Sequence, residues 1–534
     1  MDVLRDLYGK QQEEEPETGF EKANRLTAEK NTRVILGLDP TMEEFAQLGA
    51  DHLLIKYKKI IDETESYILG IKLNLAFYEN HTATRNVMMK LMAYAKGKGL
   101  LTIMDAKRGD ILDTQKHWAH ADLENFKPDI VTLHSYSGQD AVQPYLDKDP
   151  QVCAMIMGAM SNPSSQLQNL SSDGLKVYQH VALDAHKWGQ GRVGLVVGAT
   201  QGKALEYIRM VEAEYGYDPL LVLAPGLGKQ GGKPFADKNA IFPISSGLTQ
   251  EKYLQGRTPA EAAKQWRDDI NAEVEKAQEQ KTLTEHVVDG LITDGYIQTF
   301  DEPKVLAKGR EKLKKLDITL PTDKEQLVEA VRDAINKGIL TGIPENEIAV
   351  PGGDVTRVFA NIRDIGGMAD RDIPRFIAHL DAKKIRDVEK AENIKFDAVN
   401  IVPHGKLATG YLTADYLNLP NIVLRDSDKP GHDRAVGGLR KLAPDARIAT
   451  LEDVATSGGS TIKNIELLRA TAKEMGIDIS AQDAFVFLRR IEEDNIANCA
   501  AHGIKLHHQI DFDYMKHLLL KSPAVAPEFK DLIR

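Results

Sequence analysis

Eight short apolar runs alternate with longer amphipathic stretches between Thr32 and Ile244, and this alternation limits the possible folds more than any other feature of the sequence. Each run has four to eight residues and is bounded by Gly, Pro, Asp or Lys, as is typical of buried parallel strands. The runs are Arg33–Leu38, Ile68–Leu75, Leu100–Met104, Ile130–Leu133, Val152–Met157, Val193–Val197, Leu220–Leu223 and Ile241–Ile244. Helix-sized segments such as Ala83–Lys96 and Asp113–Asn125 lie between most of them. The pattern predicts an α/β fold of the (β/α)8 barrel (TIM barrel) type.

A second domain is expected because 534 residues exceed what one hydrophobic core usually supports. Residues 258–280 predict the last helix of a first domain at 1–280, and the polar segment 281–323 predicts a linker. The alternation restarts from Lys324, so residues 324–534 are expected to form a second domain with an open α/β sheet. Its strand candidates are Phe396–Val402, Asn421–Leu424, Arg447–Leu451 and Ala484–Leu488.

Charge and composition exclude several classes of partner. The net charge is −11 and no long basic run is present, so neither nucleic acid nor an acidic membrane surface is an expected partner. Two cysteines, Cys153 and Cys499, are too few for a disulfide framework. The first residues are too acidic for a signal peptide, and the most apolar stretch, Val152–Met160, is shorter than the ~18 residues of a membrane span. We therefore expect a cytoplasmic protein that acts on small molecules.

Charged side chains follow successive predicted strands of the first domain. Asp39 comes after the first strand, Lys72 and Asn74 end the second, and Asp105 and Lys107 follow the third. Active sites of (β/α)8 barrels lie at the carboxyl ends of the strands. The alternative is that each residue is a solvated loop charge, but acids and bases interleaved on neighbouring strands favour one shared site.

These residues carry a family resemblance. The segment DAKRGD at 105–110, with Lys72 in GIKLNLAFYE and Asp39 in LGLDP, resembles orotidine 5'-monophosphate decarboxylases. The motifs SNP at 161–163, VGAT at 197–200 and PGLGKQGG at 225–232 follow in the family's order and resemble its bacterial-type branch. A sugar-phosphate aldolase or synthase with a related barrel is the alternative, which Lys72 and the last motifs oppose.

The resemblance implies a role for each site residue. Asp105 lies against the substrate carboxylate, and Lys107 supplies a cation and later a proton at C6 of the pyrimidine. Lys72 and Asp110 complete the charged array. The implied substrate contacts are Asp39 and Lys72 at the ribose, Ser161 at the pyrimidine amide, and Gln230, Gly231 and Gly232 at the phosphate. Asp110 and Thr114 reach into the neighbouring subunit's site, which implies a homodimer or higher homo-oligomer. Neither a metal nor an organic cofactor is implied for decarboxylation.

One position departs from the family pattern. The last predicted strand of the barrel is usually followed by Ser-Ser-Arg, whose arginine holds the phosphate, and this chain has Ser245-Ser246-Gly247. The expected bidentate cation is therefore missing. Lys229 and Lys233 are the candidates to replace it.

The second domain contains a strand, an acidic pair and a loop of small residues that opens a helix, at Ile448–Thr461. Backbone N–H groups of such a loop can bind a phosphate, and the acidic pair can accept hydrogen bonds from ribose hydroxyls. An ordinary capped helix is the alternative. The segment resembles the phosphoribosyl-pyrophosphate motif of type I phosphoribosyltransferases. The implied binding residues are Lys406, Glu452, Asp453, Thr456, Ser457, Gly458, Gly459 and Ser460.

Further motifs resemble orotate phosphoribosyltransferases. PHGK at 403–406 is similar to the pyrophosphate-side loop, Arg425 and Lys429 to the mobile catalytic loop, and Arg490 to the orotate-carboxylate contact. Together the halves resemble bifunctional uridine monophosphate synthases, which implies that Mg2+ accompanies phosphoribosyl pyrophosphate in the transferase.

The second resemblance has departures that keep an alternative open. Pro351 lies where the family carries a lysine motif, and Asp426 replaces a second loop lysine. The alternative keeps the decarboxylase and makes the C-terminal domain a catalytically silent module that binds nucleotide or stabilises the oligomer.

Overall fold

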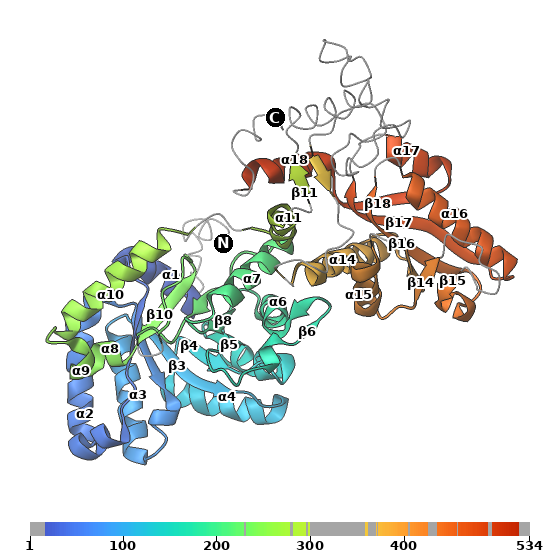
Figure 1. Cartoon of the computed structure of the whole chain (residues 1–534). Helices are drawn as coiled ribbons and strands as arrows, with labels where there is room; N and C mark the ends of the chain where they lie inside the picture. Colours follow the sequence, from blue (N-terminus) through green and yellow to red (C-terminus); the bar gives the residue numbers. More distant parts are fainter. Residues whose placement is uncertain are drawn as a thin grey trace, which may run out of the picture. The chain divides into compact units, whose positions relative to one another are not determined.

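The computed structural model describes residues 16–228, 231–277, 281–294, 297–299, 358–360, 370, 372–403, 406–424, 435–455, 458–489 and 494–522. The chain divides into two compact units, one of Met1–Leu170 with Lys176–Thr282 and one of Ser171–Leu175 with Leu283–Arg534. Figure 1 colours the first from blue to green and most of the second from yellow-green to red. No helix in these described ranges combines the length and apolarity needed to cross a membrane.

The first unit is a closed barrel of eight parallel strands in the order β1-β10-β9-β8-β5-β4-β3-β2. The strands are β1 (Val34–Gly37), β2 (Gly70–Asn74), β3 (Leu101–Arg108), β4 (Ile130–Leu133), β5 (Cys153–Ala159), β8 (Val193–Val197), β9 (Val222–Leu223) and β10 (Ala240–Ile244). Each of the eight predicted runs overlaps one strand, so the predicted barrel is confirmed. Burial on both faces explains why the runs are apolar throughout rather than alternating.

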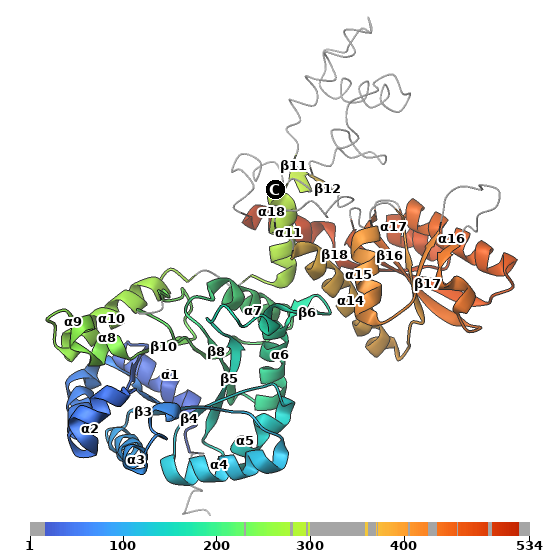
Figure 2. The same cartoon turned by 60° about the horizontal axis from the view of Figure 1, so that its bottom comes forward.

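Helices surround the barrel strands (Figure 2). The longer helices are α2 (Met42–Thr64), α3 (Thr82–Gly97), α4 (Leu112–Phe126), α5 (Gln143–Lys148), α6 (Val177–Gly189), α7 (Gly202–Glu214) and α10 (Pro259–Val274). Two short helices, α8 (Ser246–Thr249) and α9 (Glu251–Leu254), follow β10. A two-stranded hairpin of β6 (Ser171–Ser172) and β7 (Leu175–Lys176) precedes α6.

Helix α1 (Gly19–Lys30) covers the amino ends of the barrel strands. Phe20, Ala23 and Leu26 on this helix are buried in one cluster with strand residues such as Leu69 and Leu101. A capping box between Thr18 and Glu21 starts the helix. Because the amino ends are covered, the carboxyl ends remain as the side of the barrel where a site can form.

The second unit is an open six-stranded sheet in the order β15-β14-β13-β16-β17-β18. Its strands are β13 (Ala398–Ile401), β14 (Asn421–Leu424), β15 (Ala435–Gly437), β16 (Ala446–Ala455), β17 (Ile479–Arg489) and β18 (Lys505–Ile510), with only β15 antiparallel among these six. Its main helices are α14 (Ile373–Glu392), α15 (Leu407–Leu417), α16 (Gly459–Glu474), α17 (Asp494–Ala501) and α18 (Phe512–Lys521). The predicted open α/β sheet is confirmed. The two strands that were not predicted, β15 and β18, are its edges.

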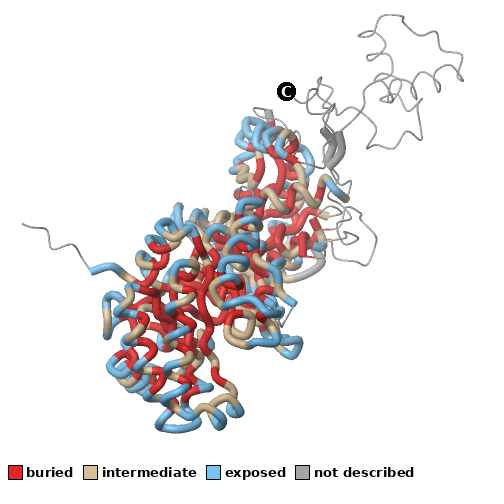
Figure 3. The backbone as a smooth tube through the Cα atoms, turned by 90° about the vertical axis from the view of Figure 1, so that its left-hand side faces the viewer, coloured by how far each residue is buried: buried red, intermediate tan, exposed pale blue. Residues whose placement is uncertain are grey.

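Two hydrophobic clusters cover the two faces of this sheet. One joins Ala398 and Ile448 to Ile465 and Leu468 of α16, and the other joins Val399 and other strand residues to α14 and α15. Neighbouring strand residues thus pack on opposite faces, as the period of two requires. Figure 3 shows the buried residues gathered in the interior and the exposed residues toward the outside.

Part of the expected linker, 281–323, forms a helix instead. Helix α11 (Leu283–Thr293) buries Leu283, Val287 and Leu291, which recur every four residues, and it contacts α14 and α18. Strand β11 (Ile297–Thr299) pairs antiparallel with β12 (Val358–Ala360). Residues 300–323 lie outside the described part of the chain.

Candidate active site

Asp105 and Lys107 lie in an irregular part of β3. Between Met104 and Arg108 the strand takes four steps where its neighbour β4 takes two, so two residues of β3 bulge out of the ladder. Lys107 adopts a left-handed backbone conformation, with φ of 50°. Such a conformation is costly for a residue other than glycine and persists where the surroundings hold it. The irregular backbone therefore sets the direction of the Asp105 and Lys107 side chains, and it interrupts the regular pairing of β3 with β4.

The two side chains belong to a row of alternating charges at the carboxyl ends of the first three strands. The carboxylate of Asp105, only 8% exposed, accepts a hydrogen bond from Lys72 Nζ at 2.9 Å and another from the ammonium group of Lys107. Asp39 Oδ2 lies 4.0 Å from Lys72 Nζ on the other side. The row therefore reads Lys107, Asp105, Lys72, Asp39.

The charges of this row support each other. Burial would raise the pKa of Asp105, but Lys72 and Lys107 outweigh that effect and hold the pKa well below the usual carboxyl range. Burial would lower the pKa of Lys72, but Asp105 and Asp39 raise it well above its ordinary value. Burial and the positive Lys107 lower the pKa of His134, so this imidazole is neutral at pH 7. The buried core of the row is thus ionised at neutral pH without any ligand.

Thr132 is a member of the site that the sequence analysis missed. Its hydroxyl donates to Asp105 Oδ1 at 2.8 Å and accepts from the backbone N–H of Lys107 at 3.1 Å. One fully buried hydroxyl on β4 therefore holds both the carboxylate and the bulged backbone. The available signal was a hydroxyl within the otherwise apolar run Ile130–Leu133.

Asp39 connects the row to the last strand of the barrel. It accepts from the backbone N–H of Asn74 at 3.1 Å and from the hydroxyl of Ser245 at 2.9 Å. Ser245 approaches so closely that a Cβ atom on Gly37 would lie 2.0 Å from its oxygen. Glycine at position 37 is therefore required for this contact.

The segment after Lys107 is fastened by Arg108. Its guanidinium lies 3.7 Å from the centre of the Trp118 ring and forms ion pairs with Glu79 at 3.1 Å and Asp122 at 3.5 Å. The sequence analysis gave Arg108 no role. These contacts hold the loop that carries Asp110 against α4.

Asp110 and Thr114 do not join the row within one chain. The Asp110 carboxylate accepts from the backbone N–H of Ile111 at 2.8 Å, and its own N–H donates to Gln115 at 3.2 Å. No cation among the described residues lies within ion-pair distance of Asp110. Thr114 is exposed on the first turn of α4. The same surface carries Ile111, which is 66% exposed.

The remaining predicted substrate contacts follow β5 and β9. Ser161 is half-buried, and a Cβ atom on Gly198 would lie 3.0 Å from its Cβ, so the loop after β8 packs closely against it. Gly231 has φ of 75°, and the N–H of Gly232 donates to Gly226 at 3.2 Å. Gln230 lies outside the described residues.

The acidic pair of the second unit, Glu452 and Asp453, lies in the last part of β16. Glu452 is buried and accepts hydrogen bonds from the hydroxyls of Ser460 and Thr461, so its carboxylate faces the start of α16. Asp453 is half-buried, and Gly458 precedes α16 with φ of 78°. Thr456, Ser457, Arg425, Lys429 and Arg490 lie outside the described part of the chain.

Lys406 has a partner that the sequence did not predict. The sequence analysis placed it on a loop that contacts pyrophosphate, but its side chain is 1% exposed and its Nζ lies 2.5 Å from the carboxylate of Asp381 on α14. Burial raises the pKa of Asp381, although Lys406 opposes that rise. In this arrangement Lys406 neutralises a buried acid.

Comparison with known proteins identifies the barrel. The family model described as "Orotidine 5'-phosphate decarboxylase / HUMPS family" matches residues 32–264. The orotidine 5'-phosphate decarboxylase of Janthinobacterium sp. (strain Marseille) is 35% identical over 222 residues, which cover 40% of this chain and 80% of that protein. The chain belongs to the orotidine 5'-phosphate decarboxylase family. Another family member, from Dehalococcoides mccartyi (strain ATCC BAA-2100 / JCM 16839 / KCTC 5957 / BAV1), is 32% identical over 47% of this chain and 97% of that protein.

One solved structure spans both units. The UMP synthase of Leishmania donovani is 21% identical, with a TM-score of 0.46, and the match covers 97% of this chain and 99% of that one. A likeness with so low a sequence identity and TM-score does not show to which family the second unit belongs. Family membership therefore concerns the decarboxylase barrel.

Removing Lys72 should destabilise the barrel by about 3–5 kcal/mol at pH 7, because Lys72→Met leaves a buried carboxylate with one partner fewer. The pKa of Asp105 should rise in the variant, so its carboxyl takes up a proton at higher pH than in the wild type. The loss should therefore shrink as the pH falls from 7 toward the ordinary carboxyl pKa of about 3.9. Urea unfolding followed by tryptophan fluorescence measures this, since Trp118, Trp188 and Trp266 all lie in the first unit.

Lys59→Met is the matched control, because Lys59 is exposed on α2 and lies 3.7 Å from Glu63. Its effect should stay below about 0.5 kcal/mol. Equal effects of the two substitutions, or a Lys72→Met effect that does not depend on pH, would contradict this account of the buried pair.

Proposed function

We propose that the barrel decarboxylates orotidine 5'-monophosphate to uridine 5'-monophosphate. The observation that carries the proposal is the row Lys107, Asp105, Lys72, Asp39 at the carboxyl ends of the strands, in a chain of the decarboxylase family. No other cluster among the described barrel residues combines two ammonium groups with a buried carboxylate at these strand ends.

Loss of CO2 from C6 leaves a carbanion that the pyrimidine ring cannot delocalise, so fixed charge must stabilise it. Repulsion between Asp105 and the substrate carboxylate contributes only about 4 kcal/mol at ~4 Å and an effective dielectric constant near 20. Strong catalysts of this kind lower the barrier by up to ~23 kcal/mol. Most of the stabilisation must therefore come from a cation held beside C6.

Lys107 is the side chain suited to that role. It is 41% exposed on the open side of the row, whereas Lys72 is buried behind Asp105. When the bond from C6 to the carboxylate breaks, the electron pair stays on C6. A proton from Lys107 Nζ then forms the new C6–H bond, and water returns a proton to the lysine. Asp105 holds the ammonium group and Thr132 holds the backbone N–H of Lys107, so little reorganisation is needed during the reaction.

The remaining roles follow from the family resemblance. Asp39 and Lys72 contact the ribose, Ser161 the pyrimidine amide, and Gln230 with the backbone of Gly231 and Gly232 the phosphate. Binding energy from the ribose and phosphate, which do not react, helps to organise the reacting end.

We also propose a homodimer in which Asp110 and Thr114 complete the site of the partner subunit. Asp110 has no cation within ion-pair distance among the described residues of its own chain, and large apolar and aromatic side chains are exposed on the loops after β3 and β4. Ile111 is 66% exposed and Tyr136 is 88% exposed. A second copy of the chain would cover these side chains and would give Asp110 a cation to face.

For the second unit we propose binding of phosphoribosyl pyrophosphate with Mg2+ and transfer of its phosphoribosyl group to orotate. The support is the position of Asp453 at the end of β16 and of Gly458, Gly459 and Ser460 at the start of the long helix α16, where N–H groups favour a phosphate. The buried Lys406 and the engaged Glu452 favour the alternative, a catalytically silent binding or oligomerising domain.

Lys107→Ala should lower kcat for orotidine 5'-monophosphate by more than about a hundredfold, which corresponds to about 2.7 kcal/mol. The reason is that it removes both the cation and the proton donor. Steady-state assays of CO2 release measure the loss. Lys116→Ala on α4 is the control, because Lys116 is exposed and pairs only with the neighbouring Asp113 among the described residues. A Lys107→Ala enzyme within tenfold of the wild type would exclude this lysine as the proton donor.

Mixing Lys107→Ala with Asp110→Ala subunits should restore activity that neither variant has alone. If the site is shared, a hybrid dimer contains one site with both residues intact. Co-refolded mixtures should approach a quarter of wild-type activity, since half of the dimers are hybrid and each has one intact site of two. The proposed shared site fails if co-refolding gives no activity above that of the separate variants.

In the Lys107→Ala background, orotate, phosphoribosyl pyrophosphate and Mg2+ should yield orotidine 5'-monophosphate that accumulates, because the next step is blocked. Asp453→Asn should abolish this product, whereas Asp387→Asn on the exposed face of α14 should not. Calorimetry with phosphoribosyl pyrophosphate separates the alternatives: binding without product indicates the silent domain, and no binding with Mg2+ rejects both.

A further inference from the structure

We infer that Arg257 supplies the phosphate-binding cation that the chain lacks at position 247. The inference rests on the proposed decarboxylase function and assigns a residue to its phosphate site. It depends on a cavity beside β10, on what fills the space next to Gly247, and on where the guanidinium of Arg257 points.

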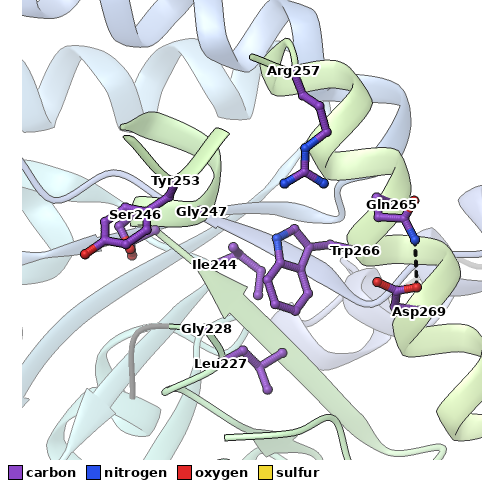
Figure 4. A pocket seen from close by; sticks show the side chains of 11 residues that line it. Leu227, Gly228, Ile244, Ser246, Gly247, Tyr253, Arg257, Gln265, Trp266 and Asp269 are labelled. Carbon is purple, nitrogen blue, oxygen red and sulfur yellow. Dashed lines mark hydrogen bonds between the residues drawn. The ribbon is translucent and has the colours of Figure 1, made fainter. Parts of the chain in front are cut away.

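A cavity of about 320 Å3 lies where β10 ends, and its walls include Gly228, Ser245, Gly247, Arg257 and Trp266 (Figure 4). Two loops meet there, the one after β9 and the one after β10. Both are the loops in which the family resemblance places the phosphate contacts. Since one water takes up ~30 Å3 in the liquid, the volume can hold a phosphate group with ordered waters.

Ser245 connects this cavity to the charged row. The residue lines the cavity, and its hydroxyl donates to Asp39 at 2.9 Å. Asp39 in turn lies 4.0 Å from Lys72, which contacts Asp105. A nucleotide with its ribose at Asp39 would therefore extend its 5' substituent toward this cavity.

A side chain at position 247 would crowd its neighbours. A Cβ atom on Gly247 would lie 3.3 Å from Trp266 Nε1 and 3.1 Å from Ile244 Cγ2, closer than most such contacts. The indole of Trp266 on α10 thus lies where that side chain would begin. Glycine at position 247 and the packing of Trp266 beside it occur together. A cation that binds the phosphate therefore has to come from another part of the chain.

Arg257 enters from the turn between α9 and α10. Gln255 and Gly256 have φ of 53° and 83°, and this pair of left-handed residues turns the chain after α9. Arg257 Nε donates to the carbonyl of Leu254 at 3.0 Å, which fixes the base of the guanidinium. Figure 4 shows the guanidinium pointing into the cavity toward the indole of Trp266.

The terminal nitrogens of Arg257 are available for a ligand. Among the described residues no carboxylate lies within ion-pair distance of them. Asp269 also lines the cavity, but it accepts a hydrogen bond from Gln265 at 2.8 Å. Two parallel N–H groups of a guanidinium match two oxygens of a phosphate, and the indole N–H of Trp266 adds a neutral donor.

The sequence analysis named Lys229 and Lys233 as replacements. Lys233 is exposed on the loop after β9 and does not line the cavity, and Lys229 lies outside the described residues. Arg257 is the cationic side chain that lines the cavity among the described residues, so it is the one that the geometry favours.

Steady-state kinetics with orotidine 5'-monophosphate and with orotidine, which lacks the phosphate, test the assignment in the full chain. Arg257→Ala should raise KM for the nucleotide roughly ten- to a hundredfold, the loss expected for a charge-assisted contact. It should leave kcat/KM for orotidine unchanged. Arg257→Lys should fall between the two, because an ammonium group cannot form the bidentate contact.

Two other variants are compared with Arg257→Ala. Lys252→Ala removes a nearby exposed charge on α9 that does not line the cavity, and its KM should match the wild type. Lys233→Ala tests the competing assignment. Arg257→Ala with KM within twofold of the wild type, or a larger effect at Lys233, would overturn the inference. A wild-type chain without decarboxylase activity would instead reject the proposed function itself.

Discussion

The carboxylate of Asp105, buried between Lys72 and Lys107, is the interaction on which the barrel site depends. A buried ion without partners is strongly unfavourable, so the surrounding strands must deliver both lysines and the hydroxyl of Thr132 to fixed positions. Register sets this arrangement. Lys72 on β2 lies opposite Ile103 on β3, and a slip of one residue would turn Lys72 to the other side of the sheet.

The same constraint extends around the barrel. Asp39 forms an ion pair with Lys72 on the side away from Asp105. Asp39 also accepts a hydrogen bond from Ser245 after β10, and the glycine at position 37 leaves room for this contact. The first three strands and the last one therefore share one polar network, and the cavity with Arg257 adjoins it. Helix α1 contributes indirectly, because it covers the opposite end of the barrel with apolar side chains.

Buried charge has a different consequence in the second unit. Lys406 and Asp381 neutralise each other almost without exposure, and Glu452 accepts from the hydroxyls of Ser460 and Thr461. In the barrel, Lys107 at the end of the row remains open to a ligand. In the described part of the second unit, Lys406 and Glu452 instead have partners within the protein.

The eight barrel strands and the central strands of the second sheet could be predicted from the residues alone, because strands buried on both faces must be apolar throughout. That Asp39, Lys72, Asp105 and Lys107 lie near one another could also be predicted, because the carboxyl ends of parallel barrel strands meet at one rim. The edge strand β18, which includes His507 and His508, lacked that apolar signal because an edge is only partly covered.

Which polar side chains contact one another becomes known only from the folded chain. Thr132 donates a hydrogen bond to Asp105, and Lys406 forms an ion pair with Asp381. Trp266 packs beside Gly247, and Arg257 points into the cavity. Periodicity records whether a position is buried, but it does not record the partner that the position meets across the fold. These contacts join residues from different elements, and their distances are fixed by the closure of the barrel and the packing of helices on the sheets. The burial of a position can therefore be predicted from the sequence, whereas the partners of buried and cavity-lining polar groups cannot.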